Sequence, residues 1–155
     1  MHPWQPSLAL AFVLTPLLMG QGLAQEKTAP ARAITAFSPN GWYVDLDADG
    51  SGRIGYGSNI MDMWSFKAKT FDIEKVTKDL KALKSDDNGK QGSHFTFGFE
   101  SERQAPDKPG PARYSRDDKV LPALFERALE AARVKDSKRG ALLLEQRPPG
   151  LPKRK

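Results

Sequence analysis

The sequence predicts an α+β fold, a two-layer sandwich in which two helices cover one face of a mostly antiparallel sheet. Two observations predict this class. Several short segments alternate apolar and polar residues with the two-residue period of half-buried strands. Two later segments each carry one apolar stripe at helical spacing. Along the chain the elements follow the order strand, strand, strand, helix, strand, short strand, helix. Because each has one apolar face, they pack as a layer of helices on a layer of sheet.

The extended segments are delimited by turn residues and by their alternation. Trp42, Val44 and Leu46 share one face of the first, and the turn Asp49–Gly52 joins it to the second as a hairpin. Three phenylalanines alternate with polar residues in the fourth, and a proline-rich loop precedes the last. The predicted strands are 41–47, 53–57, 62–71, 94–100 and, as a short one, 112–114.

The two predicted helices have recognisable first turns. Asp72 is a good N-cap for a helix that extends to Lys84, because its carboxylate can accept a hydrogen bond from a first-turn amide. The second helix begins between Ser115 and Lys119, nearer Lys119 if Pro122 is to lie in its first turn. Its apolar face consists of Val120, Leu121, Leu124, Phe125, Ala128 and Leu129.

Residues 1–24 are predicted to be a signal peptide. The apolar run Leu8–Met19 is shorter than the roughly 20 residues that a membrane-spanning helix needs, and small residues at Gly22 and Ala24 precede a cleavage point. We therefore expect an exported protein, periplasmic or extracellular, whose mature chain begins at Gln25 and has no transmembrane span. Residues 25–35 lack apolar periodicity and are predicted to be a flexible leader to a single domain at 36–134.

Composition excludes several kinds of chemistry. The 155 residues are 39% hydrophobic and 28% charged, as in an ordinary globular domain, and include no cysteine. Disulfides, thiolate metal sites and cysteine nucleophiles are therefore absent. His94 is the only histidine outside the signal segment, and we expect it to face away from the core. No spacing singles out a nucleophile with its base, so we expect no enzymatic activity.

The positive charge is concentrated at the C-terminus. Of the net charge of +5, the eight basic and two acidic residues of 133–155 contribute +6, which leaves −1 for residues 25–132. The near-neutral domain does not indicate nucleic-acid binding. Residues 135–155, with three prolines, are predicted to be a basic, flexible tail. Weak contact of this tail with an anionic cell-envelope surface is one alternative function.

An acidic turn contains the sharpest motif. Hard oxygen ligands for a cation are offered by the side chains of Asp45, Asp47, Asp49 and Ser51 and by the backbone carbonyl of Arg53. From Asp47 to Gly55 the turn resembles an EF-hand calcium loop, with Gly52 at the position of its sharp turn. The resemblance implies calcium as a ligand. Because Ser58 stands where that family has a bidentate glutamate, the expected affinity is weak, about 0.1–1 mM. The alternative is a hairpin turn that needs Asp and Gly for its backbone geometry.

Aromatic residues give the leading functional hypothesis. Tyr43, Tyr56 and Trp64 are predicted to form a recognition surface beside the acidic turn, or alternatively to be cross-strand pairs that stabilise the hairpin. We expect an exported, non-catalytic domain that binds a protein partner, of the inhibitor or immunity type. The alternatives are a weak calcium-binding module and an envelope-associated protein held by its basic tail.

Overall fold

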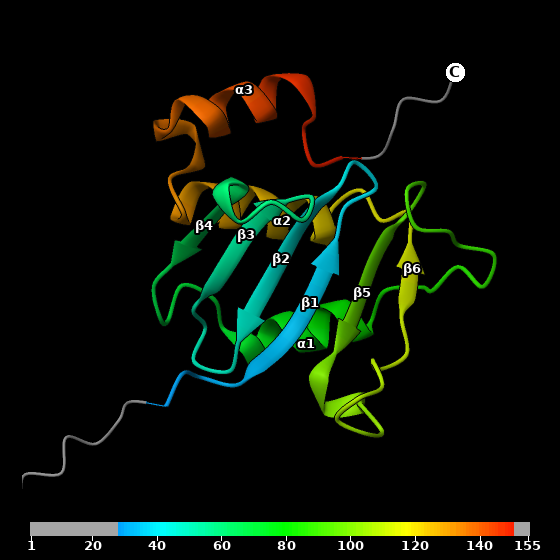
Figure 1. Ribbon diagram of the computed structural model, residues 1–155. Helices are drawn as coiled ribbons and strands as arrows, with labels where there is room; N and C mark the ends of the chain where they lie inside the picture. The colour runs from blue at the N-terminus through cyan, green and yellow to red at the C-terminus, as the bar shows by residue number, and fades with distance from the viewer. Residues whose placement is uncertain (1–27, 151–155) are drawn as a thin grey trace, which may run out of the picture.

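The computed structural model describes residues 28–150, and it confirms the α+β class with one antiparallel sheet of six strands and three helices. The strands lie side by side in the order β4-β3-β2-β1-β5-β6 (Figure 1). They are β1 (Arg32–Phe37), β2 (Trp42–Asp47), β3 (Gly52–Tyr56), β4 (Met63–Phe66), β5 (Phe95–Phe99) and β6 (Arg113–Ser115). The helices are α1 (Ile73–Lys81), α2 (Val120–Ala131) and α3 (Lys138–Gln146).

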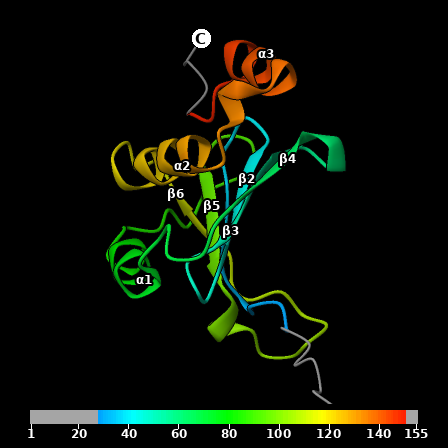
Figure 2. The ribbon, with the colours of Figure 1, turned by 90° about the vertical axis from the view of Figure 1, so that its left-hand side faces the viewer.

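The two layers are visible when the sheet is seen edge-on (Figure 2). Helices α1 and α2 lie against the same face of the sheet, and α3 lies beyond one end of the strands, next to α2. No helix in the described part of the chain covers the opposite face, which we call the open face. The predicted packing of two helices on one side of the sheet is thus confirmed.

The core lies between the sheet and these two helices. Val44 and Leu46 of β2 point into it, as do the three phenylalanines of β5, and the predicted alternation of both strands is confirmed. Burial of each large apolar side chain stabilises the fold by about 1.5–3 kcal/mol. The apolar core residues that are 1% exposed or less are Ile34, Ala36, Trp42, Val44, Leu46, Ile54, Leu80, Phe95, Phe97, Leu121, Phe125, Ala128 and Val134.

Both helices on the covered face begin close to where the sequence predicts. Asp72 caps α1, its carboxylate accepting a hydrogen bond from the Lys75 amide at 3.1 Å. Helix α2 begins at Val120, which places Pro122 in the first turn, where a missing amide hydrogen is not needed. The Asp117 carboxylate accepts from the Leu121 amide at 2.8 Å and so takes up one of the free donors of that turn.

The N-terminal side of the domain differs from the sequence prediction. Residues 32–35 were expected in a flexible leader, but they form most of β1, a central strand paired with both β2 and β5. Only Ile34 and Ala36 of this strand are buried. Two apolar residues are too short a pattern to reveal a strand whose stability comes from neighbours on both sides.

The C-terminal side also differs, because residues 138–146 of the expected flexible tail form α3. Ser137 caps this helix by accepting from the Gly140 amide, and Leu143 is buried. The guanidinium of Arg139 forms two hydrogen bonds, of 2.8 and 2.9 Å, to the buried carboxylate of Asp62. Beyond the helix, the Trp42 indole donates to the Arg147 carbonyl. These contacts fix α3 and the residue that follows it to the rest of the domain.

Candidate functional site

The open face is the candidate functional site, and its side chains come from adjacent strands in register. Thr35 of β1 is opposite Asp45 of β2, which is opposite Arg53 of β3. Phe37 is in register with Tyr43 on one side and with Thr96 on the other. Because residues opposite each other on neighbouring strands share a face, these side chains lie together on the open face.

Asp45 is the centre of the charged part of this face. It is 5% exposed and accepts hydrogen bonds from the Thr35 hydroxyl at 2.9 Å and from Arg53 Nε at 2.8 Å. Arg32 Nη2 lies 3.2 Å from the same carboxylate oxygen as Arg53. The hydrogen bond to Asp45 raises the pKa of Arg53 above its usual value. One carboxylate therefore orients two guanidinium groups.

Aromatic rings form the apolar part of the open face. Phe37 is 38% exposed and packs against Tyr43 with 6.3 Å between ring centroids. Tyr43 in turn lies across Gly55, where a Cβ atom would come within 2.5 Å of the tyrosine ring and hydroxyl. Glycine at this position therefore lets the Tyr43 ring come this close to β3.

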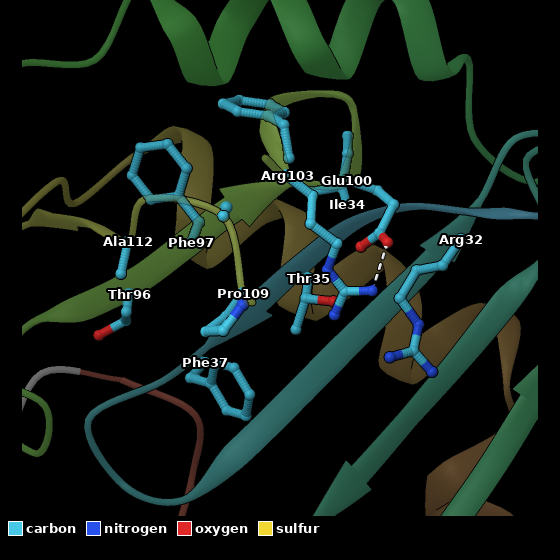
Figure 3. Close-up of a pocket in the computed structure, with 13 residues that line it drawn as sticks. Arg32, Ile34, Thr35, Phe37, Thr96, Phe97, Glu100, Arg103, Pro109 and Ala112 are labelled. Atoms are coloured by element: carbon cyan, nitrogen blue, oxygen red, sulfur yellow. Dashed lines mark hydrogen bonds and ion pairs between the residues drawn. The ribbon is translucent and has the colours of Figure 1, made fainter. Parts of the chain in front are cut away.

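A groove of about 210 Å³ lies on the open face (Figure 3). It is lined by residues of β1, of β5 and of the loop that follows β5. Phe37, Pro109 and Ala112 line one part of it, and Arg32 and Arg103 lie in the other (Figure 3). Arg103 forms an ion pair of 2.7 Å with Glu100, which also lines the groove. The groove thus has an apolar part and a part lined by two arginines, each of which is paired with a carboxylate.

The structure does not bring the three predicted recognition residues together. Tyr43 lies on the open face, but Tyr56 and Trp64 share the opposite face with Trp42. Their rings lie 5.6 and 6.3 Å from the Trp42 ring, and both side chains pack against the core. The register explains this, since Tyr56 is paired with Trp42 and Trp64 with Ile54. For these two residues the cross-strand alternative describes the geometry.

The acidic turn is closed by its own hydrogen bonds. Ser51 donates to Asp49 from its amide at 2.9 Å and from its hydroxyl at 2.6 Å, and its hydroxyl lies 3.3 Å from Asp47 Oδ2. The left-handed residue of the turn is Gly50, with φ of +79°, and Gly52, which the calcium-loop resemblance places there, begins β3 instead.

Asp45, one of the predicted calcium ligands, is engaged by the side chains of Arg53 and Arg32. The side chains of Asp47, Asp49 and Ser51 are linked to one another within the turn. Within residues 28–150, no group of three or more His, Cys, Asp or Glu side chains is arranged to hold a metal ion.

His94 is buried at the centre of a hydrogen-bonded cluster that the sequence prediction missed. It is 4% exposed, and its Nε2 lies 2.9 Å from Asp86 Oδ2 and 2.9 Å from Arg116 Nε. Its Nδ1 lies 2.9 Å from the Ser93 hydroxyl and 3.3 Å from the Lys90 amide. Hydrogen bonds from the Asn88 amide and from His94 lower the pKa of Asp86. The expectation of an outward-facing His94 was wrong because the residue precedes β5 and its ring is enclosed by the preceding loop.

Comparisons of the chain with protein-family models, with curated proteins and with solved structures find no match. Among the helices of residues 28–150, none is both long enough and apolar enough to cross a membrane. We therefore infer the function from the geometry of the open face.

Proposed function

We propose that the protein is an exported, non-catalytic domain of the inhibitor or immunity type that binds a protein partner through the open face of its sheet. The observation that carries the proposal is a sheet face that no helix of residues 28–150 covers, on which the exposed Phe37 packs on Tyr43 beside ordered arginines. Aromatic and arginine side chains are enriched at the centres of protein interfaces, because both bury large contact areas and arginine donates several hydrogen bonds.

The charges on the open face favour binding over catalysis. Asp45 is engaged by Thr35, Arg32 and Arg53, so its carboxylate stabilises the arrangement of the face. Guanidinium groups held in this way are suited to pair with anionic groups of a partner.

Capture of a partner by matched variants tests the proposal. The chain from Gln25 onward is used as bait for envelope and secreted fractions of the source organism. Phe37→Asp places a charge on the open face, and the control Ala123→Asp places the same charge at an exposed position of α2 on the covered side. We expect a stoichiometric partner to bind the unaltered chain and Ala123→Asp but not Phe37→Asp. Equal capture by both folded variants would contradict binding through the open face.

A further inference from the structure

We propose that the groove beside β1 and β5 recognises an extended segment of the partner in which an apolar side chain adjoins a carboxylate. This inference rests on the proposed function and names the chemistry of the partner. It follows from the two parts of the groove, because Phe37 and Pro109 line the apolar part and the guanidinium groups of Arg32 and Arg103 lie in the other (Figure 3). A ligand that matches both parts carries an apolar group and an anionic group close together.

The arginines have hydrogen-bond donors to spare. A guanidinium group has five donors, and the contacts of Arg32 and Arg103 engage one terminal nitrogen of each, with Asp45 and Glu100 respectively. Their side chains are 44% and 37% exposed, so the remaining donors are accessible from solvent. A carboxylate that enters the groove can therefore accept hydrogen bonds from either guanidinium.

Glu100 identifies the place of the ligand carboxylate. Its side-chain oxygen lies 2.7 Å from Arg103 Nη1 in the groove, as the carboxylate of a bound segment would. Both partners of this ion pair are partly exposed, 37% for Arg103 and 41% for Glu100, and such pairs contribute little to stability. Glu100 is thus a displaceable competitor, and its removal is expected to tighten binding.

An NMR titration with short capped peptides tests the inference directly. The probe is the acetylated and amidated peptide Gly-Glu-Phe-Glu-Gly, and the controls replace its two glutamates by lysine or its phenylalanine by alanine. We expect the probe to shift the amide signals of Thr35, Phe37 and Arg103, and to bind at least about fivefold more tightly than either control, a difference of about 1 kcal/mol.

Variants of the ion pair give opposite expected signs. Arg103→Gln is expected to weaken probe binding about fivefold, whereas Glu100→Gln is expected to tighten it by a similar factor. Arg133→Gln, at a residue whose side chain is 81% exposed and lies outside the groove, is the control and is expected to change nothing. If the pair had only a structural role, both substitutions would act in the same direction.

Three results would overturn the inference: equal binding of the lysine peptide, signal shifts confined to α1 and α2, or weaker binding by Glu100→Gln. These failures are distinct from failure of the proposed function. If Phe37→Asp abolishes capture of the partner while the peptide does not bind the groove, the open face remains the binding surface and only the chemistry assigned to the partner is wrong.

Discussion

Asp45 holds the charged side chains of the open face in place. A carboxylate with 5% exposure is unfavourable unless it is paired, and Asp45 is paired with Thr35, Arg53 and Arg32. The pairing holds the arginines on a face that also carries Phe37. The open face is therefore an ordered surface in which charge and aromatic area lie side by side.

Gly50 is required by both backbone conformation and space. Its φ is +79°, and an added Cβ would lie 2.1 Å from the Phe71 carbonyl oxygen. Gly57 has φ of +61° with no heavy atom within 4 Å of an added Cβ. We expect Gly50→Ala to lower the free energy of unfolding by about 2–5 kcal/mol, and Gly57→Ala by about 1–2 kcal/mol. Urea denaturation of the two variants measures the difference, and equal losses would show that the close approach at Gly50 costs nothing.

Asp62 gives a prediction about acid stability. Hydrogen bonds from Arg139 lower the pKa of the Asp62 carboxyl, so the native state favours its ionised form. This contribution is complete above the unfolded-state pKa of about 3.9 and is lost as the pH falls through the lower folded-state pKa. Melting temperatures measured from pH 7 to pH 2 are expected to fall less steeply below pH 4 for Asp62→Asn than for the unaltered chain. Parallel curves would contradict the assignment.

At the scale of elements, the sequence predicted those strands and helices whose formation depends on residues close together in the chain. The alternation in 41–47 and in 95–99, the Asp72 cap and the apolar face of α2 all correspond to elements of the structure. Helix α3 was missed because it depends on distant partners. Its Arg139 reaches Asp62, 77 residues away, and no local pattern records such a contact.

The candidate site was predictable only in part for the same reason. Tyr43, Asp45 and Arg53 were singled out from the sequence and lie on the open face. Arg32 and Arg103 were not, because β1 has a short apolar pattern and the loop after β5 meets the sheet only in the folded chain. The alternation in the sequence predicts which side chains share one face of a strand. It does not predict which strands are neighbours, and the strand order decides which of these side chains lie together in the site.

The acidic turn between β2 and β3 gives a prediction about calcium. The Ser51 amide and hydroxyl donate to Asp49, the same hydroxyl lies 3.3 Å from Asp47 Oδ2, and Asp45 is held by arginines, so these side chains are engaged without an ion. We expect millimolar calcium to leave the melting temperature unchanged relative to a chelator. A rise that is abolished in the double variant Asp47→Ala with Asp49→Ala would contradict this expectation and establish the calcium-binding alternative.

At the scale of the whole molecule, the C-terminal region is an integral part of the fold. Leu143 is buried, Arg139 bonds to Asp62, and the Asn40 amide donates to the carbonyls of Pro148 and Gly150 at 2.7 Å. Deletion of residues 136–155 is therefore expected to lower the melting temperature by at least about 10 °C, the equivalent of a few kcal/mol. Deletion of 151–155, which lie outside the described residues, is expected to change it little. Equal melting temperatures for the two truncated chains would contradict this account.

The shorter deletion also tests the envelope-associated alternative. Residues 151–155 contain three basic side chains, each worth about 1 kcal/mol near an anionic surface. If the tail holds the protein to an envelope, binding to phosphatidylglycerol vesicles at low salt is expected to fall on deletion of 151–155. Unchanged vesicle binding by a folded, truncated chain would rule out that role for these residues.

The measurement that tests the central claim most directly is hydroxyl-radical footprinting of the protein alone and with its captured partner. Phe37 and Tyr43 report on the open face, and Ile60 and Met61, which are 75% and 77% exposed in the turn before β4, serve as internal controls. Binding through the open face predicts that the partner reduces oxidation of Phe37 and Tyr43 and leaves Ile60 and Met61 unchanged. Protection of the controls with continued oxidation of Phe37 and Tyr43 would contradict the account.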